Sequence, residues 1–162
     1  MNLIIRVIAV IILINLLLYG LGPGSIGKLA PDFELKELKS GENISLQDYR
    51  GKIVVLDFWA SWGSPCKDVL PILAKIDSEN HTLKVLAVNV DDNKESAIKF
   101  INKYGLQLTA LNDENNNVVR NYEIPAMPTA IIIDQKGIIR YLHIGYNKNN
   151  LEDIQKEIEE IQ

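Results

Sequence analysis

The chain of 162 residues is long enough for one domain with a buried core, and its hydrophobic (47%) and charged (23%) fractions are those of a folded protein. Its net charge of −4 and the lack of any run of basic residues argue against nucleic acid as a partner. Cys66 is the only cysteine, so no disulfide can form within one chain.

The N-terminal segment differs from the rest because residues 3–21 are almost entirely apolar, with Arg6 and Asn15 as the clearly polar exceptions. A helix of this length spans roughly 28 Å, close to the thickness of a bilayer core. Two alternatives stay open: a single-pass membrane anchor, or a signal segment that is removed. The anchor is favoured because Pro23 would follow the best cleavage site. Either alternative places the domain outside the cytoplasm, and the anchor places it at the cell membrane.

A linker and a domain are expected to follow this segment. Residues 22–30 are rich in Gly, Pro and Ser, as linkers are, and precede a domain over residues 31–162. Two short segments that alternate apolar and polar residues flank Ser40-Gly41, which predicts a hairpin. The run KIVVLDFWA, residues 52–60, predicts a strand that is buried on both faces.

Strands and helices are expected to alternate after this run. Apolar residues at helical spacing predict a helix: Cys66, Val69, Leu70, Leu73 and Ile76. The segment LKVLAVNV predicts a strand and KESAIKFINKYG a helix, and the Asn cluster at 115–117 is interpreted as a loop. PTAIIID and GIIRYLHIG predict two strands joined by a tight turn. A last helix is expected from about Asn150, with these residues on its inner face: Leu151, Ile154, Ile158 and Ile161. The pattern predicts an α/β fold with a mixed central β-sheet flanked by helices.

The segment LDFWASWGSPCKDVLPIL, residues 56–73, resembles the active-site segment of thioredoxin-like proteins, and the resemblance extends from about Lys28 to Gln162. The lead-in APDFELKEL…ISLQDYRGKIVVLDFWASW and the N-terminal segment resemble the TlpA/ResA branch of that family. Members of this branch are tethered thiol–disulfide oxidoreductases outside the membrane, some of them in cytochrome c maturation. The resemblance implies a thioredoxin-like fold with an N-terminal hairpin and an extra strand-helix insertion before MPTAIIID, and it implies no cofactor.

The family's chemistry requires two cysteines, and this chain departs from it at Gly63. In the family, the first cysteine of the C-x-x-C motif attacks a substrate disulfide and the second resolves the mixed disulfide. Gly63 stands at the first position and Cys66 matches the second, so the two-cysteine cycle cannot run within one chain. Cys66 is then either a buried, inert side chain or a single reactive thiol that the missing side chain at Gly63 leaves reachable. The first alternative implies a non-catalytic module that holds an extended segment of a partner, and the second implies exchange with a partner protein's thiol or disulfide.

Asp57 is the second candidate residue for the chemistry. The resemblance places it behind the resolving cysteine, Cys66, as the carboxylate that takes and returns the proton of that thiol. A charged residue in so apolar a run is costly unless it is used or neutralised. Val69 departs from the glutamate that ResA-type members commonly carry three residues after the second cysteine.

The resemblance also implies a substrate groove around the motif. Trp59 and Trp62 should flank the site, one in the core and one as a partly exposed lip, and Pro65 should lie in the first turn of the helix. AMPT resembles the family's cis-proline loop, so Pro128 is the expected cis residue and the backbone of Met127 is expected to pair with an extended substrate segment.

The two histidines of the chain do not form a metal site by their spacing. His81 and His143 lie far from the motif in the sequence, and neither has a partner at metal-ligand spacing. We interpret both as structural and expect no metal.

Overall fold

The computed structural model of the protein describes residues 25–162, with the side chains of residues 148–151 excepted. The expected anchor or signal segment over residues 3–21 lies outside this range, as does the side chain of Leu151. Within residues 25–162, no helix is both long enough and apolar enough to cross a membrane.

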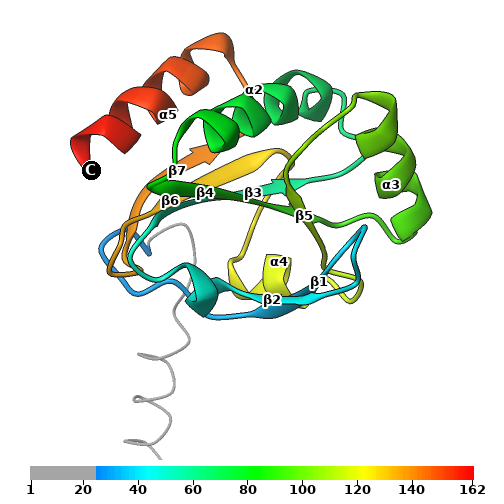
Figure 1. Ribbon diagram of the computed structural model, residues 1–162, viewed down its shortest axis with the longest axis horizontal. Helices are drawn as coiled ribbons and strands as arrows, with labels where there is room; N and C mark the ends of the chain where they lie inside the picture. The colour runs from blue at the N-terminus through cyan, green and yellow to red at the C-terminus, as the bar shows by residue number, and fades with distance from the viewer. Residues whose placement is uncertain (1–24) are drawn as a thin grey trace, which may run out of the picture.

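Seven strands form one mixed sheet in the order β2-β1-β5-β4-β3-β6-β7 (Figure 1). The strands are β1 (Glu34–Glu37), β2 (Asn43–Ser45), β3 (Ile53–Trp59), β4 (Leu83–Asn89), β5 (Thr109–Asn112), β6 (Thr129–Ile133) and β7 (Ile139–Ile144). The interior strand β3 pairs in parallel with β4 and antiparallel with β6, and every one of its residues is buried. The predicted hairpin, the strand buried on both faces and the mixed sheet are confirmed.

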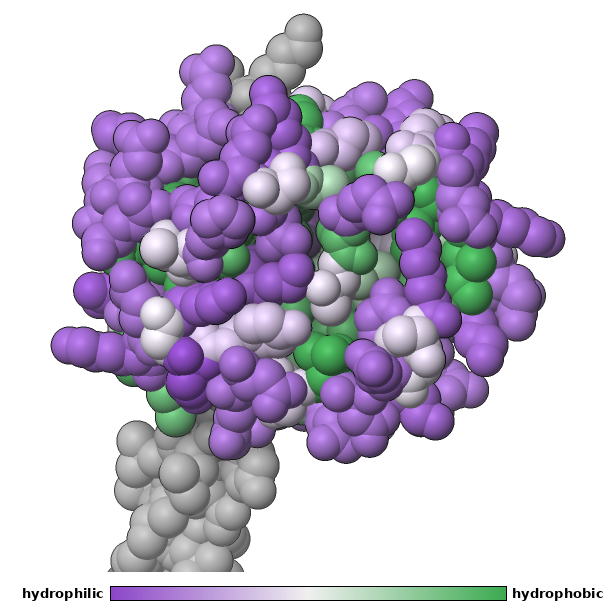
Figure 2. Space-filling model, in the orientation of Figure 1, coloured by the Kyte–Doolittle hydropathy of each residue, from purple (hydrophilic) through white to green (hydrophobic). Residues whose placement is uncertain are grey.

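Helices cover both faces of the sheet. They are the 3-10 helix η1 (Leu46–Tyr49), α2 (Cys66–Glu79), α3 (Lys94–Lys103), α4 (Asn117–Asn121) and α5 (Lys148–Glu160). Figure 1 shows α2, α3 and α5 on one side of the central strands and α4 with the β1–β2 hairpin on the other. In α5, Ile154 and Ile158 are buried, and Ile161, just after the helix, is partly buried, on the inner face that the sequence predicts. Figure 2 shows mostly hydrophilic residues on the outside of this view of the domain.

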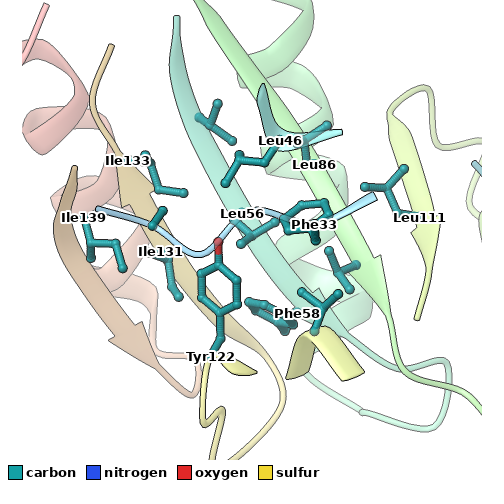
Figure 3. Close-up of a cluster of buried hydrophobic side chains, with 14 residues drawn as sticks. Phe33, Leu46, Leu56, Phe58, Leu86, Leu111, Tyr122, Ile131, Ile133 and Ile139 are labelled. Carbon is teal, nitrogen blue, oxygen red and sulfur yellow. The ribbon is translucent and has the colours of Figure 1, made fainter. Parts of the chain in front are cut away.

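The core on the α4 side fixes the chain segment that leads to Pro128. Figure 3 shows the ring of Tyr122 among the apolar residues of β3 and β6. The centroid of this ring lies 5.5 Å from that of Phe58 and 6.4 Å from that of Phe33. Its hydroxyl donates a hydrogen bond of 2.5 Å to the carbonyl of Pro31. Tyr122 therefore ties the start of the domain to the segment that enters β6.

The sequence predicts that the Asn cluster at residues 115–117 forms a loop. This prediction is wrong at Asn117, where the helix α4 begins. The cause is Asp113, whose buried carboxylate accepts hydrogen bonds from the backbone N–H groups of Asn117, Val118 and Val119 at 2.9, 3.2 and 2.8 Å. These are N–H groups that the first turn of a helix leaves unpaired. One side chain outside the helix thus starts it.

The folded domain also begins earlier than its expected boundary at residue 31. The backbone N–H of Gly27 donates to the carbonyl of Ile139 at 2.8 Å, and the N–H of Ala30 donates to the carbonyl of Gly137 at 2.8 Å. Leu29 forms a bridge with Ile138, and Ala30 is buried. Residues 25–30, which the sequence assigns to a linker, therefore run along the start of β7.

Candidate functional site

The site lies where β3 ends and α2 begins. Side chains alternate across β3, so Asp57 and Trp59 point to the face that α2 covers. Pro65 has helical backbone angles (φ −70°, ψ −20°) and is the N-cap of α2, which begins at Cys66. The N–H of Cys66 donates to the carbonyl of Gly63 at 3.0 Å. The sulfur is thus carried by the first residue of the helix.

Hydrogen bonds from the backbone of the turn between β3 and α2 to Asp91, which follows β4, stabilise this turn. Both carboxylate oxygens of Asp91 lie 3.1 Å from the backbone nitrogen of Ser61, which donates to them. The side-chain amide of Asn89 donates to Asp91 at 3.1 Å, and the N–H of Gly63 donates to the carbonyl of Ala60 at 3.1 Å. Asp91 was not among the residues predicted from the sequence. Its position just after a buried strand parallel to β3 was the available signal, since the carboxyl ends of parallel strands meet at one edge.

Cys66 is enclosed in this structure. The exposed fraction of its side chain is 0%, and it packs among Trp59, Leu70 and other apolar residues. Burial raises the pKa of the Cys66 thiol to about 11, a hydrogen bond with the backbone of Ala60 lowers it, and the charge of Asp57 raises it further. In this conformation the missing side chain at Gly63 does not expose Cys66, because Gly63 is itself buried and lies next to the sulfur. Of the two alternatives for Cys66, the buried side chain is the one that this conformation shows.

The geometry of a two-cysteine motif is nevertheless kept at Gly63. A Cβ atom on Gly63 would lie 2.9 Å from the sulfur of Cys66 and 3.2 Å from the carbonyl oxygen of Ala60. With an S–S bond of about 2.04 Å, the Cβ of one cysteine in a disulfide lies about 3 Å from the sulfur of the other. The sulfur of Cys66 therefore faces residue 63 at the separation that a disulfide needs.

Asp57 carries a carboxyl that is buried without a hydrogen-bond partner among the residues that the structure describes. The exposed fraction of its side chain is 0%, and neither oxygen hydrogen-bonds to any group of residues 25–162. Burial raises the pKa of the Asp57 carboxyl well above its usual range, because water no longer stabilises the charged form. The carboxyl is therefore held in its neutral form well above the pH at which an exposed aspartate ionises.

The two tryptophans occupy opposite environments. Trp59 has an exposed fraction of 0% and stacks obliquely on Phe100 with 5.2 Å between ring centroids. Trp62 has an exposed fraction of 72% and stands on the turn that covers Cys66. Trp59 thus belongs to the core, and Trp62 is an apolar surface next to the site.

The loop before β6 closes the other side of the site. The Met127–Pro128 peptide bond is cis. The carbonyl of Pro128 accepts a hydrogen bond of 2.8 Å from the N–H of Gly145, and Pro128 lines a small cavity together with Asp57. His143, interpreted as structural from the sequence, lines the same cavity. No sequence signal placed it there, because strand register decides which residues of β7 face β3. No group of three or more potential metal ligands occurs within residues 25–162.

Several known proteins that are similar to this chain are named for thiol–disulfide exchange. The model of the AhpC/TSA family matches residues 26–142. The chain belongs to this family. It is 34% identical over 139 residues to the thiol-disulfide oxidoreductase ResA of Geobacillus kaustophilus, covering 85% of this chain and 78% of that protein. It is 39% identical over 123 residues to the thioredoxin-like protein YneN of Bacillus subtilis, covering 74% and 71%.

A solved structure agrees with these relatives. A protein of Chlorobium tepidum, described as a thiol:disulfide interchange protein DsbE, superposes with a TM-score of 0.80 at 32% identity and covers 84% of this chain and 96% of its own. The chain is therefore a ResA-like protein of the thioredoxin-like class in which Cys66 is the single cysteine.

Replacing Asp57 with Asn should stabilise the fold, and the gain should grow with pH. The pKa of this carboxyl is higher in the folded than in the unfolded chain, so its contribution to stability is fully present below about pH 4 and is lost as the pH rises toward the folded value. The loss can reach about 1.4 kcal/mol per pH unit. Urea unfolding at pH 4 and pH 8 measures the free energy of unfolding of the wild type and of Asp57→Asn. Asp68→Asn, at an exposed position of α2, is the control. An equal free energy of unfolding for Asp57→Asn and the wild type at pH 8 would contradict the burial of a carboxyl without a partner.

Gly63→Cys should form a disulfide with Cys66 on mild oxidation, because the two positions already have disulfide geometry. Gly63→Ser is the matched control, since it adds a side chain of similar size that cannot bond to sulfur. Thiol counting and intact mass check the bond, and reduction of insulin disulfides checks whether the two-cysteine activity returns. Two free thiols in oxidised Gly63→Cys would show that the turn does not hold this geometry in solution.

Proposed function

We propose that this protein is a thiol–disulfide exchange protein in which Cys66 forms a mixed disulfide with a cysteine of a partner protein. The observation that carries the proposal is the geometry around the sulfur. The sulfur of Cys66 faces residue 63 at the separation of a disulfide, and Asp57 is near enough for its charge to raise the pKa of the thiol. The relatives named as thiol-disulfide oxidoreductases support the same chemistry.

Thiol–disulfide exchange can proceed with a single cysteine in the protein, because each S–S bond that forms replaces one that breaks. The Cys66 thiolate attacks one sulfur of a partner's disulfide, an S–S bond forms to Cys66, and the partner's other sulfur leaves as a thiolate. The proton of Cys66 passes to the Asp57 carboxylate. A second thiol, from the partner or from another dithiol protein, then attacks the mixed disulfide, releases the Cys66 thiolate and recovers the proton. The protein therefore forms one mixed disulfide in each cycle and needs a thiol from another protein to release it.

The enclosure of Cys66 makes this exchange slow and gated. With a pKa of about 11, roughly one Cys66 in ten thousand is a thiolate at pH 7. The turn over residues 60–63 must also move aside, and the bonds from Ser61 to Asp91 hold one end of it.

The surface around the turn is suited to an extended segment of a partner. Trp62 offers an exposed apolar ring, and Pro65 lies at the start of α2 beside it. On the other side, Met127 and Pro128 precede the strand β6. An extended segment that pairs with the backbone of Met127 would place a cysteine against the covering turn.

The burial of Cys66 also favours a second function, a non-catalytic module that binds a partner segment through Trp62 and Met127. Its exposed fraction of 0% and raised pKa are those of an inert core thiol. The two functions differ in whether Cys66 reacts in the native state.

A small aromatic disulfide that releases a coloured thiol separates the two functions. The native protein should release one equivalent at a rate proportional to the disulfide concentration, and Cys66→Ser should release none. The rate should rise with pH, because the sulfur must lose its proton to react and burial raises the pKa of both the Cys66 thiol and the Asp57 carboxyl that accepts the proton. A rate that is independent of disulfide concentration and equal to the rate of global unfolding would contradict exchange and leave the binding module.

We further propose that residues 3–21 hold the domain at the outer side of the cytoplasmic membrane. The support is the length of the apolar segment and the position of Arg6 near its start, where its charge can reach the cytoplasmic interface. Protease added to spheroplasts should digest the domain, while a cytoplasmic marker protein survives. Full protection of the domain until detergent is added would contradict this topology.

A further inference from the structure

A row of three residues crosses the sheet beside the site. Asp57 of β3 is in register with Ala130 of β6, and Ala130 is in register with His143 of β7. Residues in register on adjacent strands point to the same face, so all three face α2 and α5. With neighbouring strands about 4.8 Å apart, the backbones of Asp57 and His143 are about 10 Å apart. Between these two longer side chains stands only the methyl group of Ala130.

The short side chain of Ala130 leaves a cavity that both titratable groups line. Counted as the space open to the centre of a water molecule, its volume is about 10 Å³, and Asp57, Pro128, His143 and Tyr146 are among its lining residues. A volume of about 10 to 15 Å³ on this measure holds one water, provided that polar groups bind it. Both oxygens of Asp57 lack a protein partner within residues 25–162, so the carboxyl offers such groups.

His143 connects this cavity to the surface. Its Nε2 lies 2.6 Å from Oε2 of Glu157 on α5, and the side chains are 14% and 18% exposed. Because Nε2 is engaged with Glu157, Nδ1 is the ring nitrogen left for a water in the cavity. One water in the cavity would complete a chain from the Asp57 carboxyl in the interior, through the imidazole of His143, to the Glu157 carboxylate on α5.

The reaction needs such a chain. Burial raises the pKa of Asp57 well above its usual range, and whenever its carboxyl is protonated it must release that proton before it can accept another from the Cys66 thiol. Asp57 has an exposed fraction of 0%, and the neighbouring strands β4 and β6 place Ala87 and Ala130 in register with it. The titratable groups around the arrangement are Cys66 from α2, His143 from β7, Tyr146 after β7, Glu157 from α5, and Asp91 after β4, whose charge acts on Cys66.

We propose that His143, held by Glu157, is a proton-relay residue that exchanges the proton of Asp57 with solvent through one water in this cavity. The proton leaves Asp57 for the water while another proton of the water passes to Nδ1. The proton on Nε2 then moves to Glu157 and from there to solvent. The returning proton follows the same path in reverse. This relay rests on the proposed function, because it serves the proton transfer between Cys66 and Asp57.

The first experiment tests the link between Asp57 and His143 without any reaction of Cys66. NMR of the two histidine rings of the full chain follows their titration in the wild type and in Asp57→Asn. His143 should show a second inflection where Asp57 ionises, and Asp57→Asn should remove it. The exposed His81 is the internal control and should titrate identically in both proteins. Identical curves for His143 in the two proteins would overturn the relay, whether or not Cys66 proves reactive.

The second experiment tests the relay in the reaction with the aromatic disulfide. His143→Gln, which keeps a polar side chain but cannot pass a proton, should slow the reaction on the order of tenfold at pH 7. It should have no further effect in the Asp57→Asn protein, since the relay acts through Asp57. Tyr141→Phe is the matched control, because it removes the neighbouring bond from β7 to Glu160 and leaves the relay intact. An equal slowing by His143→Gln in both backgrounds would overturn the proposal.

A variant on the helix keeps the test decisive if His143→Gln does not fold. Glu157→Gln retains a hydrogen-bonding group beside Nε2 at a partly exposed position. It should slow the reaction in the wild-type background and leave the rate of Asp57→Asn unchanged. Two results together would overturn the relay: Glu157→Gln reacts at the wild-type rate, and the titration curve of His143 in Glu157→Gln is the same as in Asp57→Asn.

Discussion

The site is built around one costly constraint, a carboxyl group in the middle of a fully buried strand. Asp57 has no hydrogen-bond partner among residues 25–162, and a polar group in such a place costs free energy that the rest of the core must offset. On the neighbouring strands the small residues Ala87 and Ala130 are in register with it, and Cys66 of α2 is close enough for the charge of Asp57 to raise the pKa of its thiol. A packed apolar residue at position 57 would stabilise the same sheet, so stability does not account for the carboxyl, whereas the proton transfer that we propose between Cys66 and Asp57 would.

Gly63 removes the outer sulfur of the site and leaves its inner part in place. The turn before α2, the orientation of the Cys66 sulfur and the buried carboxyl are arranged as a second cysteine would require. The change therefore affects the order of events rather than the architecture. A two-cysteine protein begins exchange with an exposed sulfur, whereas the exchange proposed here must first uncover a sulfur that has an exposed fraction of 0%. The proposed exchange is slow for this reason.

The sequence predicts those parts of the fold that depend on local pattern. The continuous apolar run of β3 and the helical spacing after Cys66 indicate the strand, the helix and the face on which the sulfur lies. Asp57 is a candidate because the resemblance to thioredoxin-like proteins places a carboxylate there, and its position as the one charged residue of β3 supports this. The β1–β2 hairpin follows from the alternation on either side of Ser40-Gly41.

Features that depend on contacts between distant segments were not predictable in this way. The helix α4 starts within an Asn cluster because of one carboxylate, Asp113, which caps it from outside. The turn over Cys66 stays closed partly because Asp91 binds Ser61 from the end of β4. His143 faces Asp57 only through the register of β3, β6 and β7, which strand patterns alone do not determine.

The most direct test of this account is the rate at which Asp57→Asn forms a mixed disulfide with a small disulfide at pH 8, compared with the wild type. The account predicts that this variant is more stable and yet reacts more slowly, because the amide removes both the unfavourable buried carboxyl and the acceptor of the thiol proton. A more stable variant that reacts as fast as the wild type would contradict the account, and Asp57 would then be a residue without a part in the chemistry of Cys66.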